Sequence, residues 1–103
     1  MRARPGDSLI STVDETTIVV IRAPDRELDI RCGGAPMMDV KGPKPGQRPA
    51  GDPARQAGAQ LGKRYVNAVG DLELLVTKAG AGSLADGDEV LVMKAAKPLP
   101  ASD

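Results

Sequence analysis

The chain has 103 residues, and its 14 basic and 14 acidic side chains leave it without net charge at neutral pH. It contains no Phe or Trp and a single Tyr, so any core must be built from Val, Ile, Leu, Met and Ala. A chain of this length buries roughly 60–70 % of its unfolded surface, which is enough for one domain spanning residues 1–103.

The absence of histidine excludes several classes of site. Ser-His-Asp and Cys-His catalytic groups are impossible within this chain, and so are zinc sites built on imidazole. The single cysteine excludes an internal disulfide framework and a cysteine-rich metal site. No run approaches the ~20 apolar residues of a membrane span, and no apolar run follows the basic N-terminus. We therefore expect a cytoplasmic protein without metal, cofactor or membrane contact, and the Ala-, Gly- and Arg-rich composition is typical of a bacterium.

Two strands are predicted near the N-terminus. Residues 9–13 form a short apolar run typical of a first strand. Residues 16–22 are β-branched at six of seven positions, which predicts a strand that ends before Pro24. Because the apolar block 18–21 is continuous, we expect both faces of this strand to be covered.

The next strand is predicted from alternation. Apolar residues at 28, 30 and 32 alternate with Asp29 and Arg31, which is typical of a half-buried strand with Cys32 on its apolar face. Gly33 and Gly34 then predict a bulge or sharp bend, and residues 37–40 a continuation of the strand.

Residues 41–64 differ in composition from the rest of the chain. This segment holds four of the nine prolines, five of the twelve glycines, and six cations against one aspartate. Its net charge is therefore +5, and the remainder of the chain carries −5. The cations are Lys41, Lys44, Arg48, Arg55, Lys63 and Arg64. We interpret the segment as a Pro/Gly-rich basic loop inserted between strands. Within it, Asp52 as N-cap and Pro53 at the first position predict a short helix that ends at Leu61, before Gly62.

The C-terminal part predicts three further strands. Residues 65–69 and 72–77 form a hairpin, with Gly70-Asp71 as a two-residue type II′ turn. Residues 79–83 are a loop, and 89–94 form the last strand after a turn at Asp86-Gly87. The chain is thus predicted to be mainly β: a small antiparallel sandwich or barrel of five or six strands, with one short helix in the long basic loop.

Three residues outside the basic loop are candidate site residues: Arg31, Cys32 and Tyr65. A thiol beside the amides of a Gly-Gly bend would suit a reactive cysteine, but a lone Cys that alternates with apolar residues favours a core position. Arg31 lies on the opposite face of that strand and need not reach the sulfur. Tyr65, as the sole aromatic residue, favours a packing role over a site role.

Acidic residues gather near the end of the chain without the spacing of a calcium loop. Asp86, Asp88 and Glu89 surround Gly87, whereas an EF-hand needs its glycine at the sixth position and a glutamate at the twelfth. This cluster is interpreted as a solvated turn.

The basic loop is the best candidate for function. Cations held among prolines suit contact with carboxylates or phosphates. Nucleic acid is disfavoured as a partner because no aromatic residue except Tyr65 is available to stack on a base. We therefore expect a non-catalytic accessory or interaction protein that uses this loop to contact an acidic protein surface, a second copy of the chain or an anionic small molecule. The alternatives are a small enzyme or enzyme subunit that acts on an anionic substrate, and a nucleic-acid-binding β-barrel.

Overall fold

The computed structural model describes residues 2–42 and 51–94, which form two antiparallel sheets and one 3₁₀ turn. The larger sheet is built from β1 (Ser8–Ile10), β2 (Thr17–Arg22), β5 (Met38–Asp39), β6 (Arg64–Val66), β7 (Glu73–Lys78) and β10 (Val92–Met93). The smaller sheet is built from β3 (Ile30–Cys32), β4 (Ala35–Pro36), β8 (Leu84–Asp86) and β9 (Glu89–Val90). The 3₁₀ turn η1 spans Pro53–Arg55.

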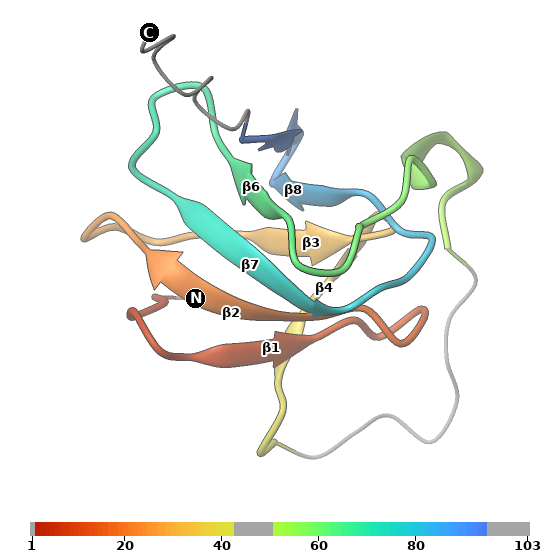
Figure 1. The fold of residues 1–103 in the computed structure, drawn as a ribbon, viewed down its shortest axis with the longest axis horizontal. Coiled ribbons are helices and arrows are strands. Elements are labelled where there is room, and N and C mark those ends of the chain that lie inside the picture. The colour runs from red at the N-terminus through yellow and green to blue at the C-terminus, as the bar shows by residue number, and fades with distance from the viewer. Residues whose placement is uncertain (1, 43–50, 95–103) are drawn as a thin grey trace, which may run out of the picture.

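The strand orders are β10-β6-β7-β2-β1-β5 and β4-β3-β8-β9, and every pairing is antiparallel. In Figure 1 the larger sheet lies in front of β3 and β8, and apolar side chains fill the space between. The predicted mainly β, antiparallel fold is confirmed. The described residues form ten short strands, more than the five or six expected, because turns and changes from one sheet to the other divide the predicted strands.

Strand β2 lies at the centre of the larger sheet, between β7 and β1. Ile18 and Val20 are fully buried against the second sheet, whereas Val19 and Ile21 on the other face are only half-buried. The expectation that both faces are covered is therefore wrong for the outer face, since no second layer packs on it among the described residues.

The last predicted strand, 89–94, joins the two sheets. β9 pairs with β8 in the smaller sheet and β10 pairs with β6 in the larger one. Between them lies the buried Leu91, whose N–H donates to the Leu84 carbonyl at 2.9 Å. The run is one extended stretch of chain that changes sheet, so it closes one end of the sandwich.

The turn between β6 and β7 differs from the predicted two-residue type II′ turn. Val66 pairs with Glu73, so residues 67–72 form the connection. Asn67 is buried, and its Oδ1 accepts hydrogen bonds from the N–H groups of Gly70 and Leu72, at 2.8 and 3.2 Å. This side chain satisfies the backbone of a wider turn, which a tight hairpin would not need.

The helix predicted from Asp52 to Leu61 is reduced to η1. Its N-terminus is as expected, because the Asp52 carboxylate accepts from the Ala54 N–H at 2.9 Å and Pro53 follows. The later N–H groups bind elsewhere: Ala57 donates to Ser83 Oγ, and Ala59 exchanges two backbone hydrogen bonds with Gly80. Hydrogen bonds to the segment that leads into β8 therefore replace the helical ones. Residues 51–62 pack against the rest of the fold and do not form the predicted helix.

Candidate functional site

Arg31 is held in place by two contacts on the outer face of β3. Alternation along the strand buries Ile30 and Cys32 and turns Arg31 outward. Its Nε lies 2.8 Å from Asp29 Oδ2, and its Nη1 donates to the Gly34 carbonyl at 3.0 Å. The guanidinium is therefore charge-paired and oriented before any ligand binds.

The Gly33-Gly34 turn contacts the part of the basic loop that contains Asp52 and η1. Both glycines have positive φ, 65° and 88°, as a two-residue type I′ hairpin between β3 and β4 requires. The Gly33 carbonyl accepts from the Asp52 N–H at 2.8 Å, and a Cβ on Gly34 would lie 2.7 Å from Asp52 Cβ. The glycine pair thus allows η1 to pack directly on the hairpin.

Arg55 is fixed at both of its backbone groups. Its N–H donates to the Asp52 carbonyl and its own carbonyl accepts from the Ser83 N–H, each at 2.8 Å. The residue is half-buried, and its guanidinium forms no ion pair with any carboxylate of residues 2–42 or 51–94. This cation on a fixed backbone is thus left without an ion-pair partner among the described residues.

Asp88 lies in the two-residue turn between β8 and β9. Gly87, at φ 60°, precedes it and donates its N–H to the Asp29 carbonyl at 2.8 Å. Asp86 accepts from the Asp29 N–H at 3.0 Å and pairs with Arg26 at 3.2 Å. The turn is thereby fastened to β3, while the exposed Asp88 carboxylate forms no ion pair within the described chain.

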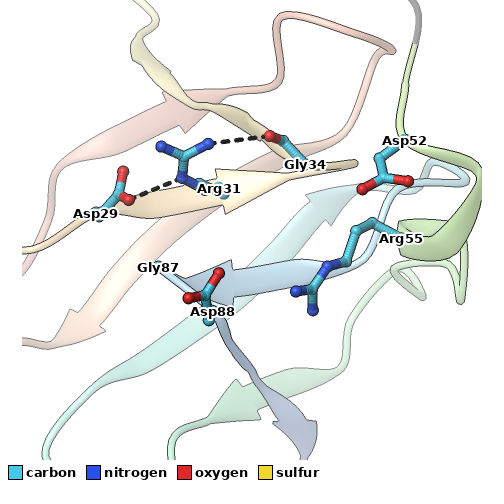
Figure 2. Close-up of a pocket in the computed structure, with 7 residues that line it drawn as sticks. All are labelled: Asp29, Arg31, Gly34, Asp52, Arg55, Gly87 and Asp88. Carbon is cyan, nitrogen blue, oxygen red and sulfur yellow. Dashed lines mark hydrogen bonds and ion pairs between the residues drawn. The ribbon is translucent and has the colours of Figure 1, made fainter.

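These elements enclose a pocket of about 400 Å³. Its lining consists of charged residues and glycines only: Asp29, Arg31, Gly34, Asp52, Arg55, Gly87 and Asp88. Figure 2 shows Arg31 turned toward Gly34 and Asp29, and Arg55 extending from η1 along β8 toward the side on which Asp88 lies. Such a lining suits recognition of a charged group by ion pairs and hydrogen bonds.

The six predicted binding cations do not share one location. Of these six, Arg55 alone lines the pocket among the residues that the structure describes, where it joins Arg31. Lys41 and Lys63 are exposed elsewhere, and Lys44 and Arg48 lie outside the described residues.

Arg64 is an exposed residue, but its guanidinium pairs with a buried carboxylate. Its Nη1 lies 2.9 Å from Glu73 Oε2, and Lys94 Nζ lies 3.1 Å from Glu73 Oε1. The Glu73 side chain is 5 % exposed. Arg64 therefore compensates a buried carboxylate that the sequence analysis did not single out. The apolar neighbours of Glu73 at 72 and 74–76 were the available signal that it enters a buried strand.

Cys32 is fully buried and does not line the pocket. Burial raises the pKa of its thiol, the nearby hydroxyls of Thr16 and Ser11 offset part of this effect, and the negative charge of Asp14 adds to it. The Gly33 N–H donates to the Ser83 carbonyl at 3.0 Å, so this amide is not available to an anion beside the sulfur. The core position favoured by the sequence is where the structure places the residue.

Tyr65 is also a core residue, 7 % exposed, and its hydroxyl accepts a hydrogen bond from the Gln60 N–H at 3.1 Å. Neither Tyr65 nor Cys32 lines the pocket, so the structure does not assemble the candidate chemical groups into one site.

Asp88 is exposed in a turn, as the sequence predicts. The sequence did not indicate that it lines a pocket, which follows from the attachment of this turn to Asp29. The described residues contain no cluster of His, Cys, Asp and Glu suited to a metal ion, and none of their helices could cross a membrane. No protein-family model matches the chain, and neither the curated proteins nor the solved structures contain a match.

Proposed function

We propose that this chain is a non-catalytic binding protein of the cytoplasm, which receives an anionic group of its ligand in the pocket through Arg55. The observation that carries the proposal is the half-buried residue Arg55, whose backbone N–H and carbonyl are both hydrogen-bonded and whose guanidinium has no carboxylate partner in the described chain. A carboxylate or phosphate would complete this site, because the planar fork of arginine matches such groups with two parallel hydrogen bonds.

The charge distribution of the chain supports the same proposal. The segment 41–64 carries +5 within a neutral chain, and Arg55 belongs to that segment. A net positive segment favours the approach of anions, and salt screens this effect; of its described cations, Arg55 is the one that lines the pocket. The group it attracts is a carboxylate or phosphate, borne either by a small molecule or by an acidic partner protein. The pocket volume of about 400 Å³ is in the range of small-molecule sites.

The test is a titration of ¹⁵N-labelled protein with sodium acetate and with inorganic phosphate at low ionic strength, followed by amide chemical shifts. We expect saturable shifts at Gly34, Arg55 and Gly87, and a loss of affinity of about tenfold in Arg55→Gln. Lys63→Gln is the matched control, because it removes the same charge from an exposed position of the same segment. Equal affinity in the two variants, or no saturable shift in the unmodified protein, would overturn the proposal.

The source of the anionic group is tested separately by native mass spectrometry of protein purified at low salt. A bound small anion identifies a free ligand, and a heterocomplex or homodimer that dissociates in the Arg55→Gln variant identifies a protein-borne group. A protein that carries neither, and also fails the titration, has no anion-binding role.

A further inference from the structure

Three charged side chains of the pocket lining form no ion pair with the described residues: Arg55, Asp52 and Asp88. Asp29 pairs with Arg31, and Asp52 accepts a hydrogen bond from the Ala54 N–H of η1. Among the described residues, the Arg55 guanidinium and the Asp88 carboxylate have neither an ion pair nor a side-chain hydrogen bond. A ligand that satisfied only Arg55 would leave a carboxylate unused at the same pocket.

The two charges are attached to opposite ends of one short strand. The Arg55 carbonyl binds the N–H of Ser83, directly before β8, and Asp88 belongs to the turn directly after it. At about 3.3 Å per residue, the backbone from Ser83 to Gly87 spans roughly 13 Å, of which the long Arg55 side chain covers part. Figure 2 shows that side chain lying along β8 in the direction of Asp88. The sheet therefore holds the backbones of Arg55 and Asp88 at opposite ends of β8.

The balance of charge disfavours a simple anion. The lining holds three carboxylates and two guanidiniums, so its formal charge is −1. A monoanion would change this charge to −2 and would also face Asp88. A monocation would bring it to zero but would leave Arg55 without an acidic partner, whereas a ligand with one negative and one positive group can pair with both Arg55 and Asp88. Its ammonium would pair with Asp88 while its acidic group paired with Arg55.

We propose that the natural ligand class is a zwitterion, an amino acid or amino-acid-like molecule whose acidic group binds Arg55 and whose ammonium group binds Asp88. This inference rests on the proposed function, which requires only the Arg55 contact. It adds Asp88 as the residue that selects zwitterions over plain anions.

The experiment compares three probes of equal chain length: 4-aminobutanoate, butanoate and butylammonium. Each is titrated into the unmodified protein at pH 7 and low ionic strength, with amide shifts as the readout. The homologues of 4-aminobutanoate from glycine to 6-aminohexanoate are included, because the span between the two charges decides which length fits. We expect one member of the amino-acid series to bind about tenfold more tightly than butanoate or butylammonium.

Two variants make the result decisive. In Asp88→Asn the advantage of the zwitterion over butanoate should disappear, while butanoate binds as well as before or better. Glu15→Gln, which removes an exposed carboxylate outside the pocket, should leave that advantage intact. The amide spectrum of each variant reports whether the fold is retained.

The outcomes separate the two proposals. If butanoate binds in an Arg55-dependent manner and no zwitterion binds more tightly, the zwitterion inference is overturned and the proposed function stands. If a zwitterion is preferred but Asp88→Asn keeps the preference, the inference is likewise overturned. If no probe binds, or binding ignores Arg55→Gln, both proposals fail.

Discussion

Glu73 is a buried carboxylate whose two oxygens bind Arg64 and Lys94. Burial alone would raise the pKa of this carboxyl, but the hydrogen bonds and charges of Lys94 and Arg64 hold it below its ordinary range. The unfolded chain therefore binds a proton more readily in acid than the native protein does. It follows that the stability contributed by Glu73 is present above about pH 4.3 and is lost as the pH falls through the native pKa.

We predict that Glu73→Gln lowers the free energy of unfolding at pH 7 by about 1–3 kcal/mol, because two charged hydrogen bonds are lost. The difference from the unmodified protein should shrink as the pH falls below about 4. Urea denaturation at several pH values measures both effects. Glu15→Gln is the control, since its exposed pair with Lys78 at 3.8 Å is worth about 0–1 kcal/mol. Equal destabilisation by both variants at pH 7 would contradict this account.

At the scale of elements, the loop 79–83 packs closely against the end of β3 and the turn after β1. Asp14 Oδ2 accepts from the Gly82 N–H at 2.9 Å, and Asp14 Oδ1 from the Thr16 N–H at 2.8 Å. Burial tends to raise the pKa of Asp14, but the hydrogen bonds with Thr16, Gly82 and Ser11 hold it below its ordinary value. The sequence predicts a simple loop for this Gly-rich run. In the structure, its glycines lie where the loop closely approaches the end of β3 and the turn after β1.

Gly82→Ala tests this approach. A Cβ at Gly82 would lie 2.6 Å from Cys32 Sγ and 2.8 Å from the Gly33 backbone nitrogen, which cannot move aside as a flexible side chain does. We predict a loss of about 1–3 kcal/mol in unfolding free energy. In a domain of this size each kcal/mol lowers the melting temperature by roughly 4–8 °C, which calorimetry resolves.

The control for this substitution is Gly42→Ala, whose new Cβ meets nothing closer than the Asp39 carbonyl oxygen at 3.3 Å. It should melt close to the unmodified protein. Should Gly82→Ala melt with it, the close approach of the loop to β3 is not a constraint on stability.

At the scale of the whole molecule, Cys32 lies at the centre of the sandwich and reports on global opening. It is 0 % exposed, and burial raises the pKa of its thiol. We predict that an aromatic disulfide reagent at pH 8 leaves the native protein unlabelled over minutes and labels it fully in urea. The denaturant dependence of the labelling rate should match that of unfolding measured by circular dichroism. Rapid labelling without urea would show that the sheets separate locally at this point.

The same thiol gives an expectation for alkaline pH. Since the native pKa is raised, the unfolded chain loses the thiol proton first, and stability falls as the pH rises through the ordinary cysteine value of about 8.5. Cys32→Ala should remove this part of the alkaline loss, whatever it costs in packing at neutral pH.

Features that depend on neighbouring residues, such as strand burial, a bend and a helix cap, were predictable from the sequence. Period-two alternation predicted that Leu28, Ile30 and Cys32 are buried while Arg31 is not, and the structure agrees. The Gly33-Gly34 bend and the cap at Asp52 also follow from residues adjacent in the chain, because turn and cap chemistry depends on local backbone angles.

The tertiary structure alone decided which charges remain available. In the sequence, Arg55 and Arg64 cannot be told apart, because both are cations of the basic loop. In the structure, Arg64 pairs with the buried Glu73, whereas Arg55 lines the pocket. The helix predicted beyond Arg55 stops because Ala57 hydrogen-bonds to Ser83, 26 positions away in the chain, and Ala59 to Gly80, 21 positions away. Such long-range pairing competes with local helix propensity and leaves no periodic signal in the sequence. The pocket could therefore not be predicted, because its lining residues come together only in the folded chain.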